Sequence, residues 1–161
     1  MLFVKRNAFL TTSAAAVALF GAGSSGVLAE DFIVDTAVAV PNGDINNIID
    51  GDDVITVTSL GSIDVSSRPD DDAINATGDN NIITNNGRLV TDGDRSAGVF
   101  VTDSDALEGT HVRNNNSITT GGLEANGIEL SSKYGLDGNM VTNGGAITTS
   151  GDNADGIALS S

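Results

Sequence analysis

The amino-acid sequence predicts an all-β chain that folds as a right-handed parallel β-helix (β-solenoid) of about four coils behind a signal peptide. Apolar residues recur at a fixed spacing along the chain, and within each unit they alternate with polar residues as in a β-strand. Gly, Asn and Asp, which favour tight turns, separate these short segments. Aromatic residues make up only 4% of the chain, so the large side chains that dominate most compact cores are scarce.

The N-terminus has the pattern of an export signal. Lys5 and Arg6 form a basic start, residues 8–20 are mostly apolar, and small residues lead up to Ala29. We therefore expect residues 1–29 to be a signal peptide, with Glu30 as the first residue of the mature chain. A membrane anchor is the alternative, but a spanning helix needs ~20 apolar residues, and this stretch is shorter.

A repeat of 29 residues determines the predicted architecture. Residues 83–89, 112–118 and 141–147 align without a gap, and the same register continues through the second half of each unit. The matched positions are Leu89, Ile118 and Ile147; Thr91, Thr120 and Thr149; Gly93, Gly122 and Gly151; Gly98, Gly127 and Gly156; Val99, Ile128 and Ile157; and Val101, Leu130 and Leu159.

A weaker copy precedes the three regular units. Val54 and Leu60 stand one period before Ile83 and Leu89, and this copy then slips by a residue or two between positions 63 and 74. We therefore expect solenoid repeats over residues 54–161 and an N-terminal cap over residues 30–53.

One such unit has nothing against which to bury its apolar side chains. Stacked coils solve this problem, because equivalent residues then lie over one another at ~4.8 Å and form continuous interior columns. Asn85, Asn114 and Asn143 recur at one position, which predicts a ladder of side-chain amides at a turn. An antiparallel β-sandwich also uses short strands, but it does not require identical residues at a fixed offset.

The charge of the chain excludes some partners. Loss of Lys5 and Arg6 with the signal leaves all 22 acidic residues and 5 of the 7 basic ones, which changes the net charge from −15 to −17. Such a surface repels nucleic acid and anionic lipid headgroups. The absence of cysteine is consistent with export through the periplasm.

The sequence predicts no catalytic residue. His111 is the only histidine, and no nucleophile motif of the Gly-x-Ser-x-Gly type accompanies it, so we expect an exposed turn residue. Gly121-Gly122 and Gly144-Gly145 do not connect a strand to a helix, so we interpret them as turns and not as phosphate-binding loops.

Clustered carboxylates are the remaining candidates for chemistry. Glycoside hydrolysis would need one carboxyl with a raised pKa in an apolar pocket, and calcium would need acids that converge on a loop. We expect instead solvated turns and no resident metal or cofactor, with the triplet at positions 70–72 as the first place to look for calcium. The acidic clusters are Asp52 and Asp53; Asp70, Asp71 and Asp72; Asp92 and Asp94; and Asp103 and Asp105.

The units at residues 86–99, 118–128 and 143–157 share the pattern Asn-Gly-x-Ile-x-Thr-x-Gly-x-x-Ala-x-Gly-Ile in whole or in part. This pattern resembles the repeats of autotransporter passenger domains. The resemblance covers roughly residues 54–161. It implies a β-helical passenger that crosses the outer membrane through a translocator barrel. The sequence shows none of the amphipathic ~10-residue strands of such a barrel, so we expect the chain to be a fragment of a longer protein.

We therefore predict a non-enzymatic structural or adhesive protein, displayed at the cell surface or secreted, with a translocator barrel and a host or surface ligand as partners. A secreted β-helical polysaccharide-active enzyme is one alternative. It would need a stripe of charges at equivalent positions of neighbouring coils, and Arg88 and Arg113 fall at different positions of the unit. A calcium-stabilised exported repeat protein is the other alternative.

Overall fold

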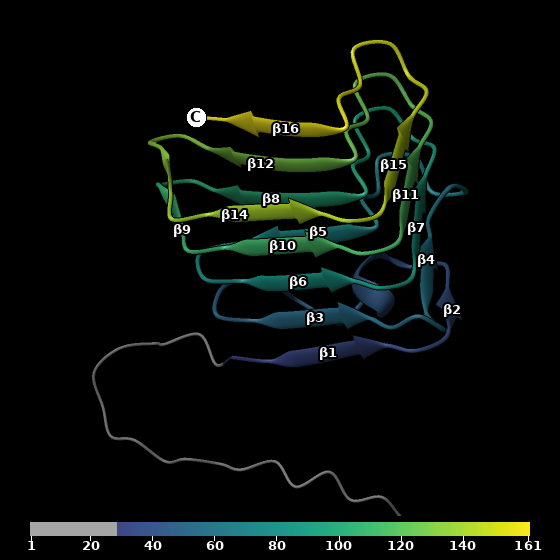
Figure 1. Ribbon diagram of the computed structural model, residues 1–161, viewed down its shortest axis with the longest axis horizontal. Helices are drawn as coiled ribbons and strands as arrows, with labels where there is room; N and C mark the ends of the chain where they lie inside the picture. Colours follow the sequence, from purple (N-terminus) through teal and green to yellow (C-terminus); the bar gives the residue numbers. More distant parts are fainter. Residues whose placement is uncertain (1–28) are drawn as a thin grey trace, which may run out of the picture.

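The computed structural model describes residues 29–161, so the predicted signal peptide lies outside the described residues except for Ala29. The described chain is a parallel β-solenoid of about four turns, as the sequence predicts. Successive turns stack along one axis, with the N-terminal strand β1 at one end and β16 at the other (Figure 1).

Three parallel sheets form the walls of the solenoid, and each turn contributes one strand to each wall. The first sheet contains β1 (Asp31–Val34), β3 (Val54–Val57), β6 (Ile82–Asn85), β10 (His111–Asn114) and β14 (Met140–Asn143). The second contains β2 (Ala37–Val38), β4 (Ser62–Asp64), β7 (Arg88–Thr91), β11 (Ser117–Thr120) and β15 (Ala146–Thr149). The third contains β5 (Ile74–Thr77), β8 (Val99–Asp103), β12 (Ile128–Ser132) and β16 (Ile157–Ser160), and a short pair joins β9 (Leu107–Glu108) to β13 (Leu136–Asp137).

The predicted register is confirmed over the three regular units. Ile118 pairs with Leu89 on one side and with Ile147 on the other. Side chains alternate between the interior and solvent along each strand, because successive residues of a strand point to opposite faces. The interior side chains form a single apolar core, in which Ile83, Leu89, Leu107, Ile118, Ile128 and Leu130 are almost completely buried.

The predicted Asn ladder is also confirmed. The Asn85 amide nitrogen donates to Asn114 Oδ1 at 2.8 Å, and the Asn114 amide donates to Asn143 Oδ1 at 2.8 Å. Asn85 and Asn114 are each 1% exposed. A buried amide is costly unless its hydrogen bonds are made, so this column stabilises only an in-register stack.

A second polar column, which the repeat analysis did not predict, precedes the strands of the first sheet. The backbone N–H of Asp53 donates to Asn81 Oδ1, that of Asn81 to Thr110 Oγ1, and that of Thr110 to Asn139 Oδ1. Asp53 Oδ1 accepts from the Glu30 N–H in the same way at 2.7 Å. One side-chain oxygen in each turn thus satisfies a backbone donor of the turn before it.

The recurring glycines mark places where adjacent turns touch. A Cβ atom on Gly122 would collide with the carbonyl oxygen of Gly93, and one on Gly151 would collide with the carbonyl of Gly122. A Cβ atom on Gly98 would collide with the Ile118 side chain. The repeat therefore requires glycine for close packing between turns.

The first repeat differs from the prediction. Ile55 and Ile63, and not Val54 and Leu60, lie beneath Ile83 and Leu89, and Leu60 is 83% exposed. The cause is chain length at the turn, because four residues connect β3 to β4 whereas two connect β6 to β7. The longer turn moves every later interior position of this coil out of the 29-residue period.

Residues 30–53, where we expected a cap, add strands to two of the sheets. β1 pairs with β3, and β2 pairs with β4, in the same parallel sense as the later turns. A 3₁₀ turn (η1, Pro41–Gly43) then leads to Asn42, whose side chain bonds to the backbone N–H and C=O of Asn75 on β5.

Replacement of one interior residue tests the stacked core. Ile118→Ala is expected to lower the free energy of unfolding by about 3 kcal/mol, because Ile118 is buried between Leu89 and Ile147 and leaves a cavity. The adjacent Thr119→Ala, on the exposed face, is expected to change it by less than about 0.5 kcal/mol. Urea unfolding followed by circular dichroism compares the two variants, and equal effects would contradict this packing.

Candidate functional site

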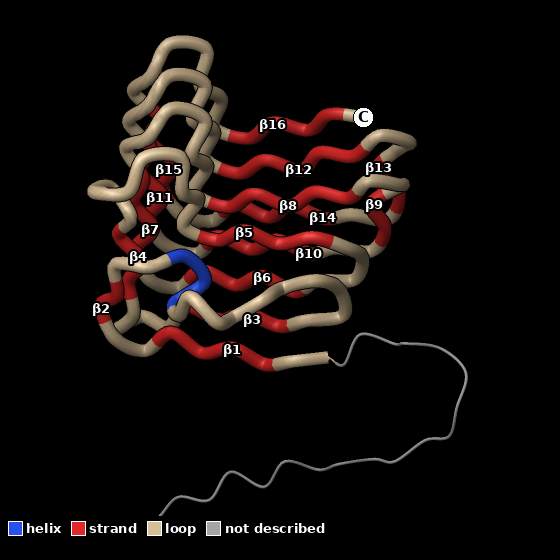
Figure 2. Tube along the Cα trace, turned by 180° about the vertical axis from the view of Figure 1, so that it is seen from behind, coloured by secondary structure: helices blue, strands red, loops and turns tan. Residues whose placement is uncertain are grey.

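Three seven-residue loops project from the solenoid between the second and third sheets. They span residues 92–98, 121–127 and 150–156, and they stack directly over one another (Figure 2). A conserved geometry within the chain holds them, because the hydroxyl of the threonine before each loop donates to a carbonyl five residues later. These threonines are Thr91, Thr120 and Thr149.

Hydrogen bonds between neighbouring loops make the stack continuous. The Arg95 N–H donates to the Leu123 carbonyl, and the Leu123 N–H donates to Asp94 Oδ1 at 2.9 Å. At the tip, Arg95, Glu124 and Asn153 have left-handed backbones with φ values of 59°, 57° and 56°. The loops therefore present different side chains on one repeated backbone.

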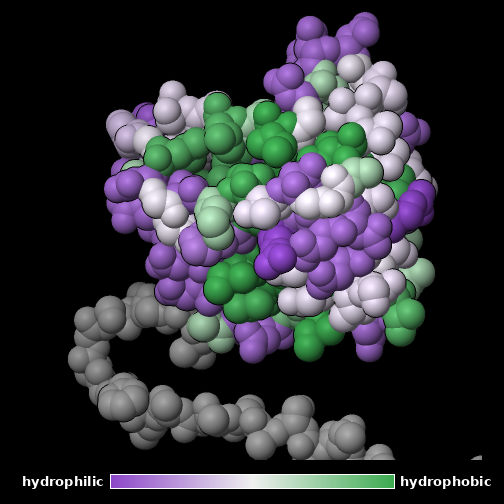
Figure 3. All heavy atoms as spheres, in the orientation of Figure 1, coloured by the Kyte–Doolittle hydropathy of each residue, from purple (hydrophilic) through white to green (hydrophobic). Residues whose placement is uncertain are grey.

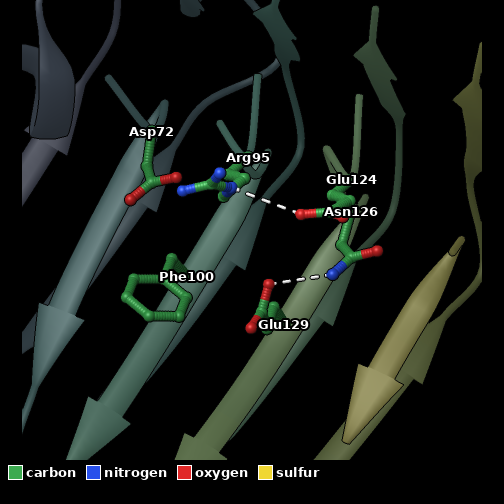
Figure 4. A pocket seen from close by; sticks show the side chains of 6 residues that line it. All are labelled: Asp72, Arg95, Phe100, Glu124, Asn126 and Glu129. Carbon is green, nitrogen blue, oxygen red and sulfur yellow. Dashed lines mark hydrogen bonds and ion pairs between the residues drawn. The ribbon is translucent and has the colours of Figure 1, made fainter. Parts of the chain in front are cut away.

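A pocket of about 350 Å³ lies where these loops meet the outer face of the third sheet. It is lined by Asp72, Arg95, Phe100, Glu124, Asn126 and Glu129 (Figure 4). Phe100 and Glu129 are neighbours on β8 and β12, and their side chains point outward because Val99, Val101, Ile128 and Leu130 fill the interior. This arrangement combines an aromatic ring with ionisable groups in a concave surface.

Asp72 is the most perturbed group of the pocket. Its Oδ1 accepts the Ala97 N–H at 2.6 Å, and its Oδ2 accepts the Asn75 amide at 2.9 Å. Burial raises the pKa of Asp72 to about 6, and the negative charges of Glu129 and Asp71 act in the same direction, whereas the two hydrogen bonds oppose the shift. The Asp72 carboxyl is thus held in place within an unfavourable negative environment.

Two other interactions order the pocket. The Asn126 amide donates to Glu129 Oε2 at 2.8 Å, which fixes the Glu129 side chain. Arg95 Nε lies 3.3 Å from Glu124 Oε2 in an ion pair that is largely exposed. Surface pairs of this kind contribute little to stability, so Arg95 remains a mobile cation at the rim.

The open end of the core forms a second hollow of about 370 Å³ near β14 and β16. Its apolar lining is visible as green side chains in Figure 3 and includes Leu130, Leu136, Val141, Ile157 and Leu159. These residues occupy interior positions of the last two turns. The hollow is therefore a continuation of the core columns and not a separate site.

His111 is exposed, as predicted, but it lies at the start of strand β10 and not in a turn. Its backbone pairs with Ile82 and Met140 of the neighbouring turns, because the threonine at position 110 ends the preceding corner. The interpretation of Gly121-Gly122 and Gly144-Gly145 as turns is confirmed, since both pairs connect strands. Arg88 and Arg113 lie in different sheets, as predicted.

Of the acidic clusters, the pair at the first corner differs most from the prediction of solvated turns. Asp53 is 1% exposed and belongs to the buried polar column, whereas Asp52 is exposed and accepts a hydrogen bond from Asn80. The burial follows from its position, because the Asp53 side chain must reach the N–H groups of Glu30 and Asp50.

The other acids are dispersed. Asp71 pairs with Arg68 at 2.6 Å, Asp70 is exposed, and only Asp72 enters the pocket, so the triplet does not converge. Asp92 is exposed, Asp94 bonds to the next loop, and Asp103 Oδ1 accepts the Asp105 N–H at 2.7 Å. Within residues 29–161, no group of three or more histidine, cysteine or acidic side chains is arranged to hold a metal ion.

Sequence reasoning missed Phe100, Glu129 and Asn126 as pocket residues. Phe100 and Glu129 occupy equivalent outward positions 29 residues apart, so their proximity could have been found by applying the repeat to the outer face. Asp72 could not be placed in this way, because it lies in the irregular first repeat, where Ile74 pairs with Val99 only 25 positions later.

The chain matches no protein-family model, no curated protein and no solved structure. In the part of the chain that the structure describes, no helix has the length and apolar character required to cross a membrane.

The raised pKa of Asp72 predicts a pH-dependent stability. Because the folded chain holds this proton more tightly than the unfolded chain, the contribution is fully present below about pH 4 and is lost as the pH rises through 6. Relative to Asp72→Asn, the wild type is expected to lose up to about 2 kcal/mol of unfolding free energy between about pH 4 and 7.5. Urea titrations of both proteins at each pH measure this difference, and a constant difference would refute the assigned shift.

Proposed function

We propose that this protein is an exported, non-catalytic solenoid that displays its projecting loops at the cell surface or in the extracellular space. The observation that carries the proposal is the contrast between the inside and the outside of the repeat. Interior positions are constant from turn to turn, whereas the loop tips carry Arg95, Glu124 and Asn153 on the same backbone. A regular rod with variable tips suits structural display or adhesion.

The proposal includes an autotransporter-like passenger role. Its support is the resemblance of the repeats to passenger domains, together with the export signal predicted over residues 1–29. The parallel solenoid is compatible with this role, since such a fold needs no disulfide and grows turn by turn. In this role, a translocator barrel is the partner for passage across the outer membrane, and a host or surface ligand is the partner of the loops.

One observation favours a second candidate, a polysaccharide-active enzyme. The pocket holds two carboxyl groups, Asp72 and Glu129, and the raised pKa of Asp72 is the property that a proton donor needs in glycoside hydrolysis. Release of reducing sugar ends by the purified protein, lost in Asp72→Asn, would favour this candidate over display.

Processing of the N-terminus tests export. When the full chain is produced with a C-terminal tag in a Gram-negative bacterium, the exported protein is expected to begin at Glu30, as intact mass and N-terminal sequencing would show. Ala29→Tyr is expected to block this cleavage, because the signal peptidase reads small side chains next to the bond. Glu30→Gln is the matched control and leaves the cleavage site small on its N-terminal side. An unshortened cytoplasmic chain would contradict the proposal.

A further inference from the structure

The pocket beneath the loops contains two carboxylates that no cation neutralises. Asp72 accepts hydrogen bonds from the Ala97 N–H and the Asn75 amide, and Glu129 accepts one from the Asn126 amide. All of these donors are uncharged. Among residues 29–161, no Lys or Arg nitrogen forms an ion pair with either carboxylate.

The aromatic ring of Phe100 lies between these two groups. Asp72 precedes β5, Phe100 is on β8 and Glu129 is on β12, so the three come from consecutive turns (Figure 4). The face of an aromatic ring carries negative electrostatic potential, and a cation within about 6 Å of its centre is attracted to it. The ring and the carboxylates therefore favour the same kind of ligand.

The single cation of the pocket lining does not fulfil this role. Arg95 bonds to Glu124 at the rim, and its side chain is 80% exposed. The lining as a whole carries three acidic groups against this one basic group. The charge of the pocket is complementary to a ligand that is positively charged and partly apolar.

We infer that this pocket binds a basic side chain, the guanidinium or ammonium group of an Arg or Lys residue, presented by a partner protein. The aliphatic part and the charged head of the ligand stack on Phe100, and Asp72 and Glu129 accept its N–H donors from either side. The prearranged carboxylates need little reordering, because backbone and amide donors already fix them.

The net negative charge of the lining disfavours anionic ligands such as phosphate groups and acidic sugars. A neutral saccharide would use the ring as well, but it would also use Arg95 as a hydrogen-bond donor. The two ligand classes therefore predict opposite effects for the loss of Arg95.

This inference deepens the proposed display function, since it names the chemistry that the loops would recognise. The binding test uses the purified protein in solution, so it fails or succeeds independently of export.

The experiment is a titration of the ¹⁵N-labelled protein with Nα-acetyl-arginine amide and Nα-acetyl-lysine amide at low salt, followed by NMR. The amide signals of Ala97, Phe100, Asn126 and Glu129 are expected to shift together, with a dissociation constant that rises with added NaCl. Cellobiose, a neutral disaccharide, is the second probe, and glucosamine distinguishes a cationic sugar from an amino-acid side chain.

Three variants assign the binding groups. The double variant Asp72→Asn, Glu129→Gln is expected to weaken binding about tenfold, and Phe100→Leu, which keeps an apolar side chain but removes the ring, about threefold. Arg95→Ala is expected to leave binding unchanged or to strengthen it, because it removes a competing positive charge. Glu108→Gln, an exposed acid on β9, is the matched control and is expected to have no effect.

Each other result overturns the inference. Cellobiose binding that is lost in Arg95→Ala would identify a saccharide site. Preference for glucosamine over both amino-acid amides would identify an amino sugar as the ligand. Equal weakening by Glu108→Gln and by the double variant would reduce the effect to the overall negative charge of the protein. Absence of any shift with the two amides would exclude the site.

Discussion

In-register stacking of equivalent residues in successive turns is the constraint on which the rest of this structure depends. A single turn cannot bury its apolar side chains, and burial is complete only when each interior residue meets its counterpart above and below. Ile118 is 1% exposed because Leu89 and Ile147 cover it from both sides. The same constraint excludes a Cβ atom at Gly122, where the carbonyl oxygen of the previous turn fills the space.

Polar side chains reinforce this register at the corners. The Asn85–Asn114–Asn143 ladder and the column that begins at Asp53 both place a side-chain oxygen opposite a donor of a neighbouring turn. Apolar side chains tolerate a shift along the strand more readily than directional hydrogen bonds do. A displacement by one residue would leave buried amides without partners, and each such group costs about 1–3 kcal/mol.

The same stacking positions the pocket. Phe100 and Glu129 lie side by side because adjacent turns repeat the outward position, and the loops above them stack through Arg95, Leu123 and Asp94. The loop tips are the part of the repeat that the core does not constrain. Chemical variety is therefore confined to the surface that a partner would meet.

The regular repeat made most of the fold predictable from the sequence. The interior columns from Ile83 onward follow directly from a 29-residue offset, and so does the Asn ladder, because these features depend on periodicity alone. Predictions were wrong where the chain length of a turn changes, as at Leu60, and where a polar side chain is buried for its hydrogen bonds, as at Asp53. The pocket was missed because Asp72 lies in the irregular repeat and because outward positions were not compared between turns.

Contacts between methyl groups test the stacking most directly. In an NMR sample with labelled methyl groups, Ile118 should show short-range nuclear Overhauser effects to both Leu89 and Ile147, since the three side chains occupy one interior column. Contacts of Ile118 with only one of these residues, or with neither, would contradict the solenoid and everything inferred from it.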